Sequence, residues 1–249
     1  MKLLYLDCSM GAAGDMLSAA LLELFPNREE ILEKLNGIKI PGIKYEAERS
    51  AKCGIYGTHL KVSYLGQEEK QGEYPAHHHH TGMKDIDALI KELNLSEDIK
   101  EKVRDVYKII ADAEARVHGM EPEFIHFHEL GTMDALADIS AFCYLLSELK
   151  PKKIIASAVR TGYGSVRCTH GLMPVPAPAT ANILKGIPVY AGDIEGEMCT
   201  PTGAALIKYF AGSFGNMPLM SIEQIGYGAG TKSFADRPNL LRAMLGEKE

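Results

Sequence analysis

Two histidines and a glutamate lie within one short stretch of the chain, and these residue types bind metals or transfer protons. His126 and His128 share a face if residues 125–129 form a strand, because successive side chains of a strand alternate between its two faces. Glu129 follows them directly. Imidazole nitrogens suit zinc, nickel, copper or iron. The stretch is therefore a candidate metal site or acid–base site.

The residues after Glu129 are expected to bring further carboxylates to the same place. Gly131 ends the strand, and Thr132 is a suitable N-cap for a helix that runs to about residue 148. Asp134 and Asp138 are four residues apart, so they share one face of that helix. Carboxylates there bind magnesium or manganese, or orient the imidazoles. Spacing alone leaves a second interpretation open, in which Asp134 only complements the helix dipole and the histidines are partly buried polar residues.

A second candidate site follows the first predicted strand, residues 2–7. A small-residue turn that contains Ser9, Gly11 and Gly14 leads to a helix that starts at Asp15. Unpaired N–H groups at such a helix start attract anions, while Asp7 and Asp15 add carboxylates and favour a cation or a cation-bridged phosphate. The alternative is a tight turn followed by an ordinary helix start. The turn lacks the pattern of a Walker loop or of a dinucleotide-binding fingerprint.

Four consecutive histidines, His77, His78, His79 and His80, lie in a polar, glycine-bearing segment at residues 66–83. The composition predicts a loop inserted between elements of one fold. Adjacent imidazoles in a loop bind nickel or zinc without a preformed cage, which indicates recruitment of metal rather than catalysis. The alternative is a solvated loop without a function.

Two later segments are candidates for binding an anionic substrate. Residues 160–171 form a long glycine-rich loop that carries Arg160, Arg167 and His170. Thr200 is the predicted N-cap of a helix that begins at Pro201, and Thr202 lies in its first turn. Capping by itself accounts for Thr200, although an anion on the free N–H groups is also compatible with this pattern.

The order of the remaining elements predicts an α/β or α+β fold with a mixed sheet flanked by helices, in one domain over residues 1–249. Besides the elements above, we expect helices at 28–35, 84–93 and 96–118 and strands at 43–52, 57–65, 153–159 and 240–245. A glycine-rich turn is expected at residues 225–230.

Composition excludes several classes of protein. The formal charge of -6 argues against a general nucleic-acid binder, and no apolar run has the length of a membrane span. The start of the chain lacks the features of a signal peptide, so a cytoplasmic location is expected. The five cysteines are odd in number and widely spaced, which predicts free thiols in a reducing compartment.

Four motifs, taken together and in this order, resemble one family, LarC, the nickel insertase that completes the nickel-pincer nucleotide cofactor of lactate racemase. The similarity runs from residue 3 to about residue 246 and rests on Asp7-Cys8-Ser9-Met10-Gly11-Ala12-Ala13-Gly14-Asp15-Met16, on the stretch from His126 to Asp138, on residues 170–180 and on Thr200-Pro201-Thr202-Gly203-Ala204-Ala205.

The resemblance implies a reaction that spacing alone does not show. In that family Ni²⁺ is inserted into pyridinium-3,5-bisthiocarboxylic acid mononucleotide, with one carbon–nickel and two sulfur–nickel bonds formed and CTP consumed. By this resemblance His77–His80 would gather nickel and pass it to His126, His128 and Glu129. A carboxylate or histidine would accept the ring proton. Arg160, Arg167 or the turn at residues 11–14 would hold the substrate phosphate. The loops at residues 7–15 and 160–171 are therefore expected to face the stretch at residues 126–138.

The chain departs from the fuller form of the family because it ends at Glu249, whereas members also carry a C-terminal domain associated with the nucleotide triphosphate. The resemblance therefore implies an N-terminal portion that handles nickel and substrate and does not turn over alone. Mg²⁺ or Mn²⁺ with CTP, a homo-oligomer and a lactate racemase-type apoenzyme downstream are further expectations.

Two other functions remain open at this point. One is a nickel-binding or delivery module with no catalysis of its own. The other is a metal-dependent hydrolase built on Asp7, Asp15, His126 and His128, which the spacing permits and the resemblance disfavours.

Overall fold

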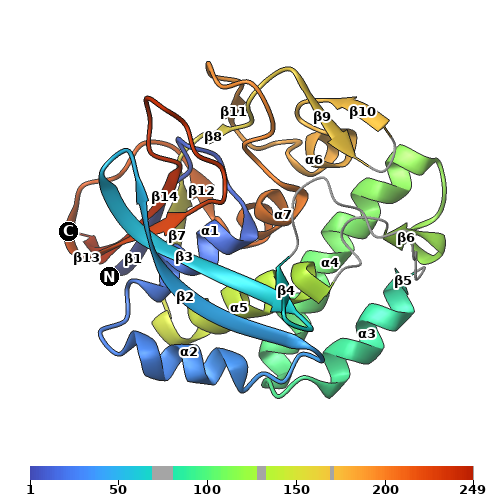
Figure 1. The fold of residues 1–249 in the computed structure, drawn as a ribbon, viewed down its shortest axis with the longest axis horizontal. Coiled ribbons are helices and arrows are strands. Elements are labelled where there is room, and N and C mark those ends of the chain that lie inside the picture. The colour runs from blue at the N-terminus through green and yellow to red at the C-terminus, as the bar shows by residue number, and fades with distance from the viewer. Residues whose placement is uncertain (69–80, 128–132, 169–170, 249) are drawn as a thin grey trace.

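The computed structural model of the chain describes residues 1–68, 81–127, 133–168 and 171–248. These residues form a mixed α/β fold in which helices pack on one large sheet (Figure 1). The fold class expected from the sequence is therefore confirmed. In these ranges no helix combines the length and the apolar character that crossing a bilayer requires.

Groups of helices and groups of strands follow one another along the chain. They are α1 (Gly14–Leu22), α2 (Arg28–Asn36), α3 (Met83–Glu92), α4 (Glu97–His118), the 3-10 helix η1 (Pro122–Phe124), α5 (Met133–Leu149), α6 (Pro178–Ile183) and α7 (Pro201–Phe210). The strands are β1 (Lys2–Asp7), β2 (Ile43–Lys52), β3 (Ile55–Tyr64), β4 (Gln67–Glu68), β5 (Thr81–Gly82), β6 (His126–Phe127), β7 (Lys153–Ala156), β8 (Val159–Arg160), β9 (Ser165–Cys168), β10 (Gly171–Pro174), β11 (Val189–Tyr190), β12 (Ser213–Phe214), β13 (Met220–Ala229) and β14 (Leu240–Lys248).

Within the described ranges the main sheet has the strand order β12-β7-β1-β14-β13-β3-β2, and β4 pairs with β3. β1 is parallel to β7 and antiparallel to β14, so it lies inside the sheet. The apolar residues of β1 are accordingly buried, and Asp7 lies at the carboxyl end of the strand. The turn that follows β1 is therefore held at a fixed place.

Helix α1 is apolar almost all round because it is enclosed by the sheet and by α5. Residues 225–230 were expected to form a turn, and that expectation is wrong, because β13 extends through Ala229. A Cβ atom on Gly228 would lie 1.8 Å from the carbonyl oxygen of Met16, and one on Gly226 would lie 2.0 Å from that of Ala20. The glycines are thus strand residues that let α1 approach the sheet.

The single strand expected at 153–159 is also wrong, because β7 ends at Ala156 and β8 begins at Val159. Between them Ser157 turns the chain, and its Oγ accepts a hydrogen bond of 2.9 Å from the N–H of Cys8. β8 then leaves the main sheet and pairs in parallel with β11. This break carries Arg160 towards the turn after β1, whose Cys8 carbonyl accepts a 3.2 Å bond from the Arg160 N–H.

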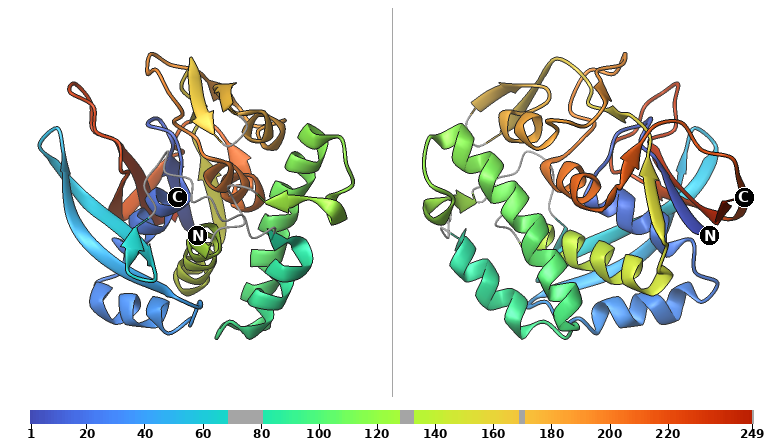
Figure 2. Two further views of the ribbon diagram at one scale, coloured as in Figure 1. Left: turned by 45° about the vertical axis from the view of Figure 1, so that its right-hand side comes forward. Right: turned by 180° about the vertical axis from the view of Figure 1, so that it is seen from behind.

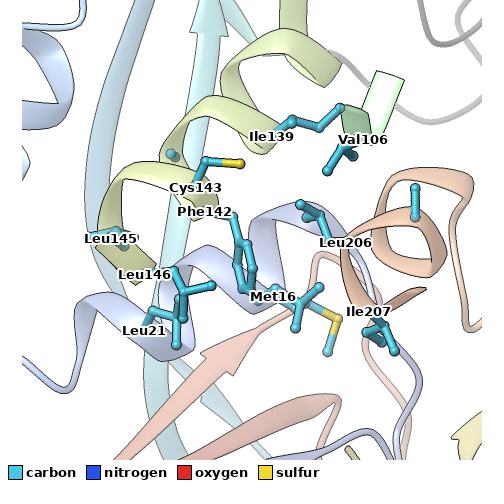
Figure 3. Close-up of a cluster of buried hydrophobic side chains, with 14 of the residues drawn as sticks. Met16, Leu21, Val106, Ile139, Phe142, Cys143, Leu145, Leu146, Leu206 and Ile207 are labelled. Carbon is cyan, nitrogen blue, oxygen red and sulfur yellow. The ribbon is translucent and has the colours of Figure 1, made fainter. Parts of the chain in front are cut away.

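The main core lies between the sheet and the helices. Figure 3 shows Met16 of α1 and Leu206 of α7 facing Phe142 of α5, and all three side chains are buried. Seen from the side, α5 lies between the β2–β3 hairpin and α4 (Figure 2). This central position fixes the start of α5, and with it Asp134 and Asp138, relative to α1.

Candidate functional site

The strand that carries His126 is paired with the strand that follows the histidine run. β5 and β6 form an antiparallel ladder in which Gly82 lies opposite His126 and Thr81 opposite Phe127. β5 begins one residue after His80. Two candidate regions that are far apart in the sequence are thus joined through their backbones.

Several predicted residues lie outside the part of the chain that the structure describes. These are His77, His78, His79, His80, His128, Glu129 and His170. Within the described ranges no group of three or more His, Cys, Asp or Glu side chains is arranged to hold a metal ion. The assignment of nickel ligands therefore rests on the sequence pattern alone.

Asp7 uses both carboxylate oxygens in contacts within the protein. Its Oδ2 accepts a 2.7 Å hydrogen bond from Nη2 of Arg242 on β14, and its Oδ1 accepts one of 3.1 Å from the N–H of Ser9. Arg242 is the register partner of Asp7 in the β1–β14 ladder, which accounts for the pairing. A metal at Asp7 would have to displace this guanidinium, so the geometry favours a structural ion pair.

The turn at residues 11–14 is shaped by close packing. Gly11 has a φ of 91°, and a Cβ atom there would lie 1.9 Å from the Met198 carbonyl oxygen. That carbonyl accepts a 2.9 Å bond from the Ala12 N–H, and the Gly11 N–H donates to Cys8. These two amides are therefore occupied, and Gly11 is explained by the approach of Met198 rather than by an anion cradle.

Gly14 places α1 directly against the acidic face of α5. A Cβ atom on Gly14 would lie 2.5 Å from Oδ2 of Asp138, whose side chain is buried. Burial, and then the charges of Asp138 and Asp134, raise the pKa of the nearby phenols of Tyr45 and Tyr107. The start of α1 and the first turns of α5 thus face one another, as the sequence predicts.

Asp15 lies in the first turn of α1, and its carboxylate accepts a 2.8 Å bond from the N–H of Met16. This contact is the ordinary one for an acid at a helix start, where the dipole favours negative charge.

The start of α7 is capped by Thr200, whose Oγ1 accepts a 3.2 Å hydrogen bond from the N–H of Gly203. The Oγ1 atoms of Thr200 and Thr202 are 3.3 Å apart, and Thr202 is buried. The Thr200 N–H donates to the Ala12 carbonyl at 3.0 Å, so this helix start lies beside the turn after β1. The predicted cap and the Pro201 helix start are both confirmed.

The long loop expected at residues 160–171 is wrong in part, because Arg160 ends β8 and Arg167 lies in β9. The two arginines lie in different environments. Arg167 is exposed on the β9–β10 hairpin. Arg160 is largely buried, and its Nη1 donates a 2.8 Å hydrogen bond to Oδ1 of Asp193. Of these two, Arg160 is the one held beside the turn after β1.

Sequence reasoning overlooked several polar residues near Arg160. The Tyr190 hydroxyl donates a 3.3 Å bond to the carbonyl of Ser9, and Arg237 binds the same Asp193 oxygen as Arg160 does. Lys232 donates to the carbonyl of Glu197, and burial lowers the pKa of its amine. Tyr190 belongs to β11, whereas Lys232 and Arg237 lie between β13 and β14, so no regular spacing links them in the sequence. The signal available for Lys232 and Arg237 was their positive charge.

Comparisons with known proteins agree with the motifs. The profile of the nickel insertion protein family matches residues 4–249. A protein of Geobacillus kaustophilus, named pyridinium-3,5-bisthiocarboxylic acid mononucleotide nickel insertion protein, is 41% identical over 248 residues, which is 100% of this chain and 60% of that protein. Proteins of the same name from Staphylococcus epidermidis, 42% identical, and Desulfitobacterium hafniense, 40% identical, cover 100% and 99% of the chain with 60% and 59% of their own length.

No solved structure matches the chain. The chain spans about 60% of the length of these relatives. The matched profile covers nearly all of it, and so the chain belongs to the nickel insertion protein family.

Proposed function

We propose that this chain is the metal- and substrate-handling part of an enzyme that inserts Ni²⁺ into pyridinium-3,5-bisthiocarboxylic acid mononucleotide. The names of the relatives supply the substrate. The observation that supports the proposal most is the β5–β6 ladder, because it joins the segment after the histidine run to His126. A nickel ion gathered by the histidine run would then have a short path to the imidazole of His126.

In the proposed reaction nickel is a substrate, gathered by His77–His80 and passed to a site formed by His126, His128 and Glu129. Ni²⁺ replaces the proton on the pyridinium carbon between the two thiocarboxylates, and each thiocarboxylate contributes one sulfur–nickel bond. A carboxylate or imidazole accepts the departing proton. Asp134 is a suitable alternative proton acceptor or orienting group because it lies in the first turn of α5, the helix that follows these residues.

The rest of the proposed cycle extends beyond this chain. CTP would be bound together with Mg²⁺ or Mn²⁺, and consumed, by the part of the longer relatives that this chain does not span. The completed cofactor would pass to a lactate racemase-type apoenzyme in the cytoplasm, and the enzyme would act as a homo-oligomer.

One mixing experiment tests this proposal. The chain is incubated with Ni²⁺, CTP and the dithiocarboxylate mononucleotide, with and without the remaining C-terminal part of a relative, and pincer formation is followed by its absorbance. We expect product only in the complete mixture. Product without the C-terminal part would contradict the division of labour, and no product in the complete mixture would contradict the insertase function.

A second candidate is a nickel-delivery module without catalysis, which the four consecutive histidines favour. Replacing His77–His80 by alanine should lower nickel stoichiometry under both functions. The replacement should slow pincer formation at limiting nickel under the insertase function alone. His118→Ala is a matched control, because this histidine lies at the end of α4 and pairs with Glu114. An unchanged nickel affinity in the fourfold variant would remove the run from both accounts.

A further inference from the structure

Two guanidinium groups from distant parts of the chain share one carboxylate oxygen. Nη1 of Arg160 donates to Oδ1 of Asp193 at 2.8 Å, and Nη1 of Arg237 donates to the same atom at 2.6 Å. Arg160 is the last residue of β8, whereas Arg237 belongs to the loop between β13 and β14. The two positive groups are therefore held close together, and an anion between them offsets their mutual repulsion.

The acid is the outermost member of this cluster. The side chain of Asp193 is 68% exposed, whereas those of Arg160 and Arg237 are 16% and 26% exposed. The arginines are thus embedded in the protein, and the carboxylate covers them from the solvent side. A ligand arriving from solvent would meet the carboxylate first and could take its place by moving one exposed side chain.

Both arginines are fixed by contacts that do not depend on Asp193. The Arg160 guanidinium lies over the Tyr190 ring, 5.4 Å from its centroid, and against Gly192. Arg237 makes two bonds to Asp236, from Nε at 2.9 Å and from Nη2 at 2.6 Å. Removing the Asp193 carboxylate would therefore leave two oriented donors.

The donors also have capacity for further acceptors. Within the part of the chain that the structure describes, Nε of Arg160 is buried without a hydrogen-bond partner. The bond from Arg237 lowers the pKa of Asp193 to about 2, so the acid is an anion at neutral pH. Because the Asp193 side chain is mostly exposed, its carboxylate returns to solvent when another anion takes its place, and no buried acid is left unpaired.

We propose that Arg160 and Arg237 form a binding site for a phosphate monoester, and that Asp193 occupies this site until the phosphate displaces it. A phosphate offers three acceptor oxygens and a charge near -2, which matches two converging guanidinium groups better than one shared carboxylate oxygen does. That the phosphate belongs to the mononucleotide substrate rests on the proposed function; the anion site itself does not. The site lies beside the turn after β1, because the Tyr190 hydroxyl binds the carbonyl of Ser9.

The competing explanation is a purely structural ion pair that fastens the loop at 230–239 to the loop at 191–197. Lys232, which donates to the Glu197 carbonyl, already makes one such connection. The two explanations predict opposite effects of removing the acid. If Asp193 competes with phosphate, its removal tightens phosphate binding. If Asp193 only links the two loops, its removal leaves phosphate binding unchanged or weakens it.

The test titrates inorganic phosphate into the chain by calorimetry at low ionic strength, where electrostatic binding is least screened. Asp193→Asn should tighten phosphate binding about three- to tenfold, as expected from loss of a weak competing ion pair. Arg237→Gln should weaken phosphate binding at least about tenfold, because one charge-assisted donor is lost. The affinity of Arg237→Lys should lie between that of Arg237→Gln and that of the unaltered chain. Asp87→Asn is the control: it removes an equal charge from the ion pair between Asp87 on α3 and Arg104 on α4, and it should leave phosphate affinity unchanged.

An Asp193→Asn protein that binds phosphate no better than the unaltered chain would overturn the proposal. To identify the source of the phosphate, nicotinic acid mononucleotide and its dephosphorylated riboside are compared as competitors. Competition by the mononucleotide alone assigns the site to a nucleotide phosphate. If phosphate responds as expected but the complete mixture forms no pincer, the proposed function fails and the anion site stands. If the pincer forms but phosphate affinity is unchanged by the Asp193 and Arg237 substitutions, this inference alone fails.

Discussion

Gly14 at the start of α1 lies directly against Asp138 of α5, so that a Cβ atom on Gly14 would come within 2.5 Å of Oδ2 of Asp138. The contact joins the turn that follows β1 to the helix that follows the His126–Glu129 stretch. Two motifs separated by more than a hundred residues are thereby packed against each other. Their relative position therefore depends on the absence of a side chain at Gly14.

Gly14→Ala should lower the free energy of unfolding by about 1–3 kcal/mol, the usual cost of inserting a methyl group into a packed interface. The added Cβ would also lie 2.7 Å from the Cβ of Asp138, so α5 itself must shift. Urea denaturation measures the effect. Gly212→Ala is the control, since its Cβ would lie 3.7 Å from the nearest neighbouring atom, the Ile154 carbonyl oxygen. Equal stability of the two variants would show that the helices are not in contact at Gly14.

Thr200→Ala should destabilise the chain by about 1 kcal/mol, because the Gly203 N–H loses its cap at the start of α7. Thr200→Ser keeps the hydroxyl and should recover most of the loss. The comparison of the two midpoints of thermal unfolding checks this. A nucleotide affinity that falls in Thr200→Ala and returns in Thr200→Ser, with no change in stability, would instead assign the hydroxyl to the substrate.

Asp7→Asn should leave the number of bound nickel ions unchanged, because both oxygens of Asp7 already bind Arg242 and the Ser9 amide. A double-mutant cycle of Asp7→Asn with Arg242→Gln should give a coupling of at most about 1 kcal/mol, since Arg242 is partly exposed. Equilibrium dialysis with nickel and chemical denaturation supply the two readouts. Loss of a nickel equivalent in Asp7→Asn would restore this acid to the ligand set.

The cysteines should differ sharply in reactivity at pH 8. Cys53 is exposed, whereas Cys8, Cys143 and Cys199 are buried, and burial raises the pKa of all three thiols. A thiol reagent should therefore modify Cys53 in the native chain and the other three only after unfolding, and Cys53→Ser should abolish that reaction at the exposed site. Rapid native modification of Cys8 would contradict the packing of the turn after β1.

The same thiols define the sign of a pH effect. The unfolded chain loses thiol protons above about pH 9, while the folded chain keeps them because its thiol pKa values are higher. The contribution of these residues to stability is therefore complete below that pH and declines as the pH rises above it. Cys143→Ala should make the decline of the unfolding free energy between pH 8 and pH 10 shallower.

The sequence predicted the helices and the central strands well, because their apolar periodicity is strong. It failed at residues 225–230, where glycines that are typical of turns lie in β13. The reason is tertiary: Gly226 and Gly228 make room for the backbone of α1. No local pattern distinguishes a glycine required by a neighbouring helix from one required by a turn.

The candidate site was predicted in part. The approach of residues 7–15 to α5 was expected, and the Gly14–Asp138 contact confirms it. The cluster of Arg160, Asp193 and Arg237 was not predicted beyond Arg160, because it joins the end of β8 to two segments that lie far away in the sequence. Such clusters follow from the topology of the sheet, which single-sequence patterns do not contain.

The most direct test of the account is anomalous diffraction at the nickel edge from crystals of the chain soaked in Ni²⁺. The account predicts an ordered nickel ion about 2.1 Å from an imidazole nitrogen of His126 or His128, beside the strand that pairs with β5. An ordered nickel ion bound instead by Asp7 and Asp15, with none beside β6, would contradict it.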